Sequence, residues 1–220
     1  MTHTPISRDF QERLAAAGSA LTLSPGAVLF EADAPADSVF LVTRGQLRTY
    51  QATANDNRLV EVLGEGQWLG ATALAGLSSR GFRAVAVELS SVIRIETDHF
   101  LHELSQDARL LAEVLRDLAC RLDQANETAS MLAYVDSESR LVHTLLRLSY
   151  SAAARESGDA VTVQITHHEL AQAIGVARET VSLALTQLRQ QNVVRTGRSQ
   201  VHFDRKVLAG FKKSELVPLA

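Results

Sequence analysis

The sequence predicts an α+β protein that combines an antiparallel β jelly roll, a long helix and a winged helix-turn-helix. Three patterns indicate this fold class. Short apolar runs separated by turn residues extend from Leu21 to Glu96, and an apolar heptad repeat extends from Asp107 to Val135. The segment from His167 to Gln191 has the spacing of a helix-turn-helix. The expected domains are the jelly roll over 1–106, the long helix with its hinge over 107–136, and the winged helix-turn-helix over 137–220.

The composition is that of a folded globular chain, with 46% apolar and 21% charged residues among 220. Charged residues interrupt every apolar run well before the roughly 20 residues that a membrane helix needs. The first residues lack the basic start and apolar core of a secretion signal, and the single cysteine, Cys120, cannot form an internal disulfide. We therefore expect a cytoplasmic protein with no membrane contact.

The charge is unevenly divided along the chain. Residues 1–139 carry 11 basic and 19 acidic side chains, whereas residues 140–220 carry 11 basic and 6 acidic side chains. A positive C-terminal part is typical of a domain that binds a polyanion such as double-stranded DNA. The alternative from charge alone is chance scatter over the surface.

The turn-rich N-terminal region predicts short strands of an antiparallel sandwich. Turn residues such as Pro25, Pro35 and Gly45 separate its apolar runs. These runs are Val28–Phe30, Val39–Val42, Leu47–Tyr50 and Leu59–Leu63. Their spacing is too short for a parallel sheet with crossover helices.

The long helix predicts a homodimer. Seven residues recur at alternating intervals of four and three: Leu111, Leu115, Leu118, Leu122, Ala125, Ala129 and Leu132. This average period of about 3.5 places them in one seam, as in a coiled coil. The alternative is a single amphipathic helix packed on its own sandwich, but the unbroken spacing favours the dimer interface.

The C-terminal part predicts a second helix over Ser139–Ala154, a polar loop from Arg155 and a strand over Val161–Ile165. Thr166 and Glu169 then have the spacing of a capping box, which satisfies the first N–H groups of a helix. The apolar, small and turn residues of a helix-turn-helix follow: Leu170, Ala171, Ile174, Gly175, Val176, Val181 and Leu185.

This spacing leaves polar residues on the outer face, at the start of the second helix, where base edges are read in a major groove. The segment Val193–Phe203 predicts a β-wing whose cations contact phosphates. The residues expected to contact DNA are Arg178, Glu179, Ser182, Thr166, His168, Arg195 and Arg198. The alternative is an ordinary helical hairpin with a solvated polar face.

The order of sandwich, long helix and winged helix-turn-helix resembles the bacterial cyclic AMP receptor protein and FNR superfamily of transcription regulators. The resemblance extends from about Leu21 to Phe203 and is most specific at Arg178–Ser182. The stretch around Leu132–Asp136 and Arg140 resembles the hinge of that family. The resemblance implies a homodimer that binds an inverted-repeat operator, with RNA polymerase as a further partner.

The resemblance implies an effector pocket in the sandwich. In cyclic AMP receptors, a Glu of this pocket holds the ribose hydroxyl, and an Arg and a Ser hold the phosphate. Here Ala71 replaces the Glu and Gly81 replaces the Ser, which argues against cyclic AMP, while Arg80 remains. The stretch from Arg80 to Ala86, which we call the effector cassette, is also similar to that of cyanobacterial nitrogen-control regulators, whose ligand is 2-oxoglutarate. The expected effector is therefore a small anion, either a 2-oxo acid or another nucleotide.

The effector pocket is expected at Gly70, Ala71, Arg80, Gly81, Phe82, Arg83, Arg121, Ala125 and Asn126. The alternative is a sandwich without ligand in which Arg80 or Arg121 pairs with acids such as Glu88 or Asp117. No metal cofactor is expected, because an iron–sulfur cluster needs several thiolates, and the pair His99 and His102, near the start of the helical stretch, is typical of a protein surface.

No catalytic constellation is present in the sequence in a suitable context, so an enzyme is not expected. The competing function is a cyclic-nucleotide-type sandwich that acts through protein–protein contacts rather than through DNA. The basic C-terminal part and Arg178 argue against this alternative.

Overall fold

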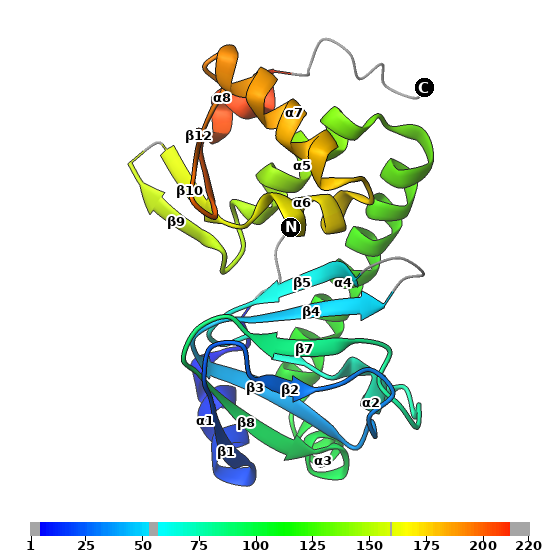
Figure 1. Ribbon diagram of the computed structural model, residues 1–220. Coiled ribbons are helices and arrows are strands. Elements are labelled where there is room, and N and C mark those ends of the chain that lie inside the picture. The colour runs from blue at the N-terminus through cyan, green and yellow to red at the C-terminus, as the bar shows by residue number, and fades with distance from the viewer. Residues whose placement is uncertain (1–4, 53–56, 159, 212–220) are drawn as a thin grey trace. The chain divides into compact units, whose positions relative to one another are not determined.

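The computed structural model describes residues 5–52, 57–158 and 160–211 (Figure 1). The chain divides into two compact units, one that ends at Gln124 and one that begins at Ala125. Helix α4 (Ala108–Tyr134) runs through this division. Among the described residues, no helix is long and apolar enough to span a membrane.

The N-terminal unit contains two four-stranded antiparallel sheets, which confirms the predicted sandwich. One sheet has the order β1 (Ser19–Leu23), β8 (Ser90–Glu96), β3 (Ser38–Arg44) and β6 (Trp68–Leu69). The other has the order β2 (Val28–Phe30), β7 (Arg83–Ala86), β4 (Leu47–Ala52) and β5 (Asn57–Leu63). The four apolar runs of the sequence lie in β2, β3, β4 and β5.

Strand β3 is apolar on both faces because it separates two cores. Phe40 and Val42 lie in the core between the sheets, together with Leu47 and Leu63. Val39 and Leu41 point to the other face, which helices cover. This two-sided burial explains why the run Val39–Val42 is continuous rather than alternating.

Two of the covering helices, α1 (Arg8–Ala17) and α3 (Thr97–Gln106), were not predicted. Each buries two side chains against the outer face of the β3 sheet: Phe10 and Leu14 from α1, and Phe100 and Leu104 from α3. The Phe100 ring lies 5.7 Å from the Trp68 ring. The short helix α2 (Ala71–Leu74) follows β6.

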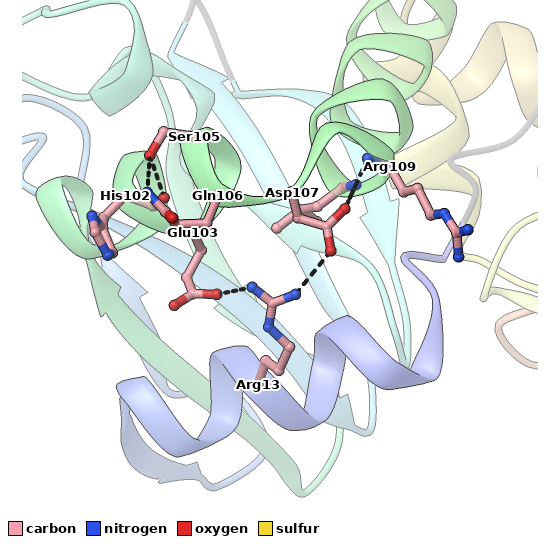
Figure 2. A network of polar contacts seen from close by, with 8 residues as sticks. Arg13, His102, Glu103, Ser105, Gln106, Asp107 and Arg109 are labelled. Carbon is pink, nitrogen blue, oxygen red and sulfur yellow. Dashed lines mark hydrogen bonds and ion pairs between the residues drawn. The ribbon is translucent and has the colours of Figure 1, made fainter.

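A polar network fixes the start of α4 (Figure 2). The Asp107 carboxylate accepts hydrogen bonds from the backbone N–H groups of Arg109, at 2.9 Å, and Leu110, at 3.4 Å. Its other oxygen accepts from Arg13 of α1 at 3.0 Å, and Arg13 also pairs with Glu103 of α3. The pKa of Asp107 is lowered mainly because its carboxylate accepts the hydrogen bond from the backbone N–H of Arg109. Asp107 therefore caps α4 and connects it to α1.

The C-terminal unit is a winged helix-turn-helix with a four-stranded antiparallel sheet of order β11-β12-β10-β9. Its further elements are α5 (Ser137–Leu148), β9 (Ala154–Ser157), β10 (Ala160–Gln164), α6 (His167–Ile174), α7 (Arg178–Gln190), β11 (Val194–Gly197), β12 (Gln200–Asp204) and α8 (Arg205–Gly210). Asp136 caps α5 by accepting from the backbone N–H groups of Glu138 and Ser139. This arrangement confirms the predicted fold class.

Two local predictions in this unit are wrong. The helix expected to reach Ala154 ends at Leu148, because the Ser149 and Ser151 hydroxyls donate to carbonyls three residues before them. The loop expected from Arg155 is the edge strand β9, which pairs with β10. Its residues are polar because an edge strand with exposed side chains needs no apolar alternation.

Candidate nucleic-acid interface and effector pocket

The helix-turn-helix is built by local signals that the sequence contains. Thr166 and Glu169 form the predicted capping box, in which Thr166 Oγ1 accepts from the Glu169 backbone N–H at 3.1 Å. The Glu169 carboxylate in turn accepts from the Thr166 backbone N–H at 2.8 Å. Gly175 ends α6 with a φ of 70°, in the left-handed region that favours glycine. The predicted turn is therefore confirmed.

The packing of α7 decides which of its residues face solvent. Val181 and Leu185 are fully buried, whereas Arg178 and Glu179 are exposed at the start of the helix. Leu183, on the same outer surface, is 63% exposed. Ala177 provides no side-chain cap for this helix. The start of α7 therefore presents a cation, an anion and an apolar side chain.

A hollow of about 540 Å³ lies between the start of α6, the start of α7 and the tip of the wing. Its lining residues are Thr166, His167, His168, Arg178, Gly197, Arg198 and Ser199. Two arginines and the N-terminus of α6 give this hollow a positive potential. It has the chemistry expected of a phosphate site. Arg195 is exposed on β11 and does not line the hollow.

Ser182 has a partner that the sequence analysis did not identify. Its Oγ lies 2.9 Å from Nδ1 of His167, the first residue of α6. Burial, and secondly the charge of Arg178, lowers the pKa of His167. The contact joins the first helix of the motif to the second, and only the folded turn brings these residues together.

Helix α4 presents two faces in the N-terminal unit. Leu110, Val114 and Asp117 are buried against the sandwich. The predicted seam is displaced from this face, so that Leu115 is 55% exposed and Leu122 is 62% exposed. Leu111 is exposed as well, and so are Ala125, Ala129 and Leu132, in the part of α4 that belongs to the C-terminal unit. Leu118 differs from the rest of the seam, since it packs against the sandwich core.

Arg80 is 2% exposed, and its guanidinium lies 4.2 Å from the centroid of the Phe30 ring and 5.1 Å from that of Phe40. Its Nη2 donates to the Ser38 carbonyl at 2.9 Å and to the Ser38 hydroxyl at 3.1 Å. Asp37, rather than the Glu88 weighed from the sequence, lies near Nη2, at 3.9 Å. Burial lowers the pKa of Arg80. Its Nη1 is buried and makes no hydrogen bond within the described chain, so the two N–H groups of this nitrogen are unsatisfied there.

Two glycines close to Arg80 in the sequence or in space differ in the room around them: Gly70 is tightly surrounded, and Gly81 is not. A Cβ on Gly70, whose φ is 103°, would lie 2.9 Å from the Ser38 carbonyl oxygen and 3.2 Å from Arg80 Nη1. A Cβ on Gly81 would meet no atom within 4 Å. Ala71 begins α2 and is half-buried. Position 81 therefore has room for the side chain of the serine found in cyclic AMP receptors. Position 70, in contrast, needs a glycine because the Ser38 carbonyl and Arg80 approach its backbone closely.

The other predicted cations of the pocket have acidic partners. Arg121 Nε donates to Asp117 at 2.8 Å, its Nη2 donates to the Trp68 carbonyl at 2.7 Å, and its Nη1 lies 3.5 Å from Glu61. The guanidinium also lies 4.6 Å from the centroid of the Trp68 ring. This arrangement matches the alternative in which Arg121 pairs with Asp117.

The remaining residues of the predicted pocket are more dispersed. Arg83 Nε lies 3.3 Å from the Glu31 carboxylate, and the Arg83 and Glu31 side chains are 40% and 61% exposed. The Phe82 ring lies 6.0 Å from the Phe30 ring. Ala125 and Asn126 are exposed residues that begin the C-terminal unit.

Comparisons with known proteins agree with this architecture. The family model for the cyclic nucleotide-binding domain matches residues 20–107, and that for the Crp-like helix-turn-helix domain matches residues 139–211. A sensing domain that indicates a small-molecule effector, joined to a DNA-binding helix-turn-helix, defines the class of ligand-responsive transcription regulators. The chain belongs to the CRP/FNR family of transcription regulators.

Among its relatives, the chain is 29% identical to the cyclic AMP receptor protein of Thermus thermophilus over 73% of this chain and 72% of that protein. It is 27% identical to a probable transcriptional regulator, flp, of Lacticaseibacillus casei over 90% of each chain. The fold is similar to the global regulator CLP of Xanthomonas campestris, with a TM-score of 0.78, 22% identity and coverage of 90% and 99%.

Proposed function

We propose that the protein is a homodimeric, sequence-specific regulator that places α7 in the major groove of an inverted-repeat operator. The observation that carries this proposal is the exposed start of α7 beside the basic hollow. Arg178 is suited to donate two hydrogen bonds to guanine O6 and N7, and Glu179 to accept from cytosine N4. Leu183 is suited to pack on a thymine methyl group. Arg198 and Arg195 hold phosphates on the wing side.

Selection of binding sites from random DNA tests this recognition. We expect two half-sites related by a dyad, with centres about 34 Å apart, or roughly one turn of DNA. Arg178→Ala should remove the guanine preference in each half-site. Selected sites without dyad symmetry, or an unchanged preference in the variant, would contradict the proposed orientation of α7. A binding constant that hardly depends on salt would instead favour a protein-binding module.

The dimer interface is supported by the exposed seam of α4, since a monomer would leave Leu115 and Leu122 in water. Leu115→Arg with Leu122→Arg should give a folded monomer that loses specific DNA binding, because unpaired charges in a buried interface cost several kcal/mol. Sedimentation measures the mass. Leu118 is unsuitable for this test because its substitution would also disturb the sandwich. An intact dimer would remove the seam from the interface.

The effector is, in this proposal, a small anion other than cyclic AMP that binds the spare Nη1 of Arg80. Titration calorimetry with cyclic AMP should show no binding at micromolar concentrations, whereas 2-oxoglutarate is the first dianion to test. Arg80→Lys should lose the response to that anion, while Arg44→Lys, at an exposed cation outside the predicted pocket, should keep it. Tight binding of cyclic AMP would contradict the proposal. RNA polymerase is the protein partner expected for a regulator of this type.

A further inference from the structure

His167 and Ser182 form a contact whose direction depends on a proton. A serine hydroxyl and an imidazole nitrogen can each donate or accept, and their 2.9 Å separation allows either arrangement. Ser182 lies one turn after Arg178, so it shares the face of α7 that begins with that arginine. Ser182 is only partly buried, so its oxygen can have a second partner besides the histidine.

The surroundings of His167 favour its neutral form in the free protein. From α7 it faces Arg178, and from the wing the hollow contributes Arg198. From its own helix it has His168 as neighbour, while the Glu169 carboxylate is engaged in the capping box. Burial is the first cause, and Arg178 the second, that lowers the pKa of His167. Near neutral pH the ring therefore carries one proton.

We propose that His167 sets the hydrogen-bonding direction of Ser182 and thereby decides which base α7 prefers at that position. The inference rests on the proposed binding of α7 to the major groove. With the ring proton on Nε2, Nδ1 accepts the Ser182 hydroxyl hydrogen, and the oxygen offers only lone pairs to DNA. It then favours a donor edge, such as cytosine N4 or adenine N6.

Protonation reverses this direction. The imidazolium donates from Nδ1 to Ser182 Oγ, so the hydroxyl hydrogen becomes free to bind an acceptor edge, such as guanine O6 or thymine O4. His167 is thus a positioning residue that converts a change of pH into a change of base preference.

DNA binding itself favours the protonated form. A phosphate that Arg198 holds in the hollow stabilises an imidazolium beside it, so the pKa of His167 is higher in the complex than in the free protein. The added affinity is fully present below the pKa of the free protein and is lost as pH rises through the pKa of the complex. Sites with an acceptor edge gain this affinity, because they also use the freed hydroxyl hydrogen.

The test compares two operators that differ only at the base pair facing Ser182. That base pair is identified as the one at which Ser182→Ala loses its preference. Fluorescence anisotropy gives the ratio of the two dissociation constants at about pH 5.5 and about pH 8, on either side of the ordinary range of histidine. The ratio cancels effects of pH that act equally on all DNA.

We expect the ratio to shift toward the acceptor-edge operator by about five- to tenfold at the lower pH, as one hydrogen bond predicts. His167→Gln should abolish the shift because the amide does not titrate. His99→Gln is the control, since it removes an exposed imidazole on α3, outside the hollow, and it should keep the shift.

Three outcomes would overturn the inference: a ratio that does not change with pH, a shift that survives His167→Gln, or a Ser182→Ala variant with no altered base preference. If Arg178-dependent selectivity persists in these cases, the proposed function stands and only the role of His167 fails. If the protein selects no DNA sequence at either pH, both proposals fail.

Discussion

Replacement of Arg121 by methionine should destabilise the N-terminal unit by about 3–5 kcal/mol, the usual cost of breaking a buried ion pair. The side chains of Arg121 and Asp117 are 14% and 2% exposed, so solvent hardly screens their interaction. Two hydrogen bonds from the guanidinium, to Asp117 and to the Trp68 carbonyl, are lost as well. Each hydrogen bond from a charged group contributes about 1.5–3 kcal/mol, which gives the same order of magnitude.

Urea unfolding followed by tryptophan fluorescence measures this effect directly, because Trp68 is the single tryptophan and lies against Arg121. Arg116→Met, on the exposed side of the same helix, is the matched control and should change stability by less than about 0.5 kcal/mol. Arg121→Met with Asp117→Leu should recover part of the loss, since it removes the charges of Arg121 and Asp117 but leaves the largely buried Glu61 carboxylate without Arg121.

The result that would refute this reasoning is an Arg121→Met protein that unfolds at the wild-type urea concentration. If that variant also lost its response to an anionic effector, Arg121 would be a ligand of the effector rather than a structural cation. The ion pair with Asp117 would then contribute little to the fold.

Variants at the proposed DNA interface, the effector cassette and the capping box have defined expectations as well. In binding titrations across salt concentrations, Glu179→Ala should relax discrimination at one base pair in each half-site by about 1–3 kcal/mol, with an unchanged slope of log binding constant against log salt. Arg198→Ala should weaken binding to all sequences alike and lower that slope by about 1. If Arg198→Ala changed the base preference and Glu179→Ala changed the salt slope, Arg198 would read the base and Glu179 would not. Gly81→Ser should fold normally, since its Cβ meets no atom within 4 Å, and together with Ala71→Glu it should tighten cyclic AMP binding at least about tenfold by calorimetry. No gain would mean that the cassette is misaligned. Thr166→Ala should cost the C-terminal unit about 0.5–2 kcal/mol in thermal unfolding, and an unchanged transition would show that the capping box is dispensable.

The sequence by itself determines the elements that depend on local pattern. The alternation of apolar and turn residues predicts the sandwich strands, and the capping box at Thr166 and Glu169 predicts where α6 begins. Gly175 marks its end because few other residues adopt the left-handed conformation there. These signals act over a few residues, so a single sequence is sufficient to identify them.

The end of α5 and the helices α1 and α3 escaped the sequence analysis because their signals are weak or short. Ser149 and Ser151 terminate α5 through side-chain bonds to the backbone, which compete with a pattern that otherwise continues. Each of α1 and α3 buries only two side chains, so its apolar repeat is too brief to distinguish from a loop.

Only the tertiary structure decided which side of α4 packs on the sandwich. Leu110 and Leu111 are adjacent and chemically identical, yet Leu110 is fully buried and Leu111 is exposed. The heptad repeat fixes a spacing, but it does not specify what covers each face. Contact with α1, α3 and the β3 sheet assigns Leu110 to the core, and this leaves most of the seam exposed.

The same reason applies to the charged and polar sites. Arg80 is 42 residues from Ser38 in sequence, and the structure makes it a buried cation whose Nη1 makes no hydrogen bond within the described chain. Ser182 and His167 are 15 residues apart on different helices, and the turn at Gly175 brings them into contact. The residue type gives each side chain its chemistry. Its partner and its burial, which together set its protonation, depend on distant segments of the chain that only folding brings together.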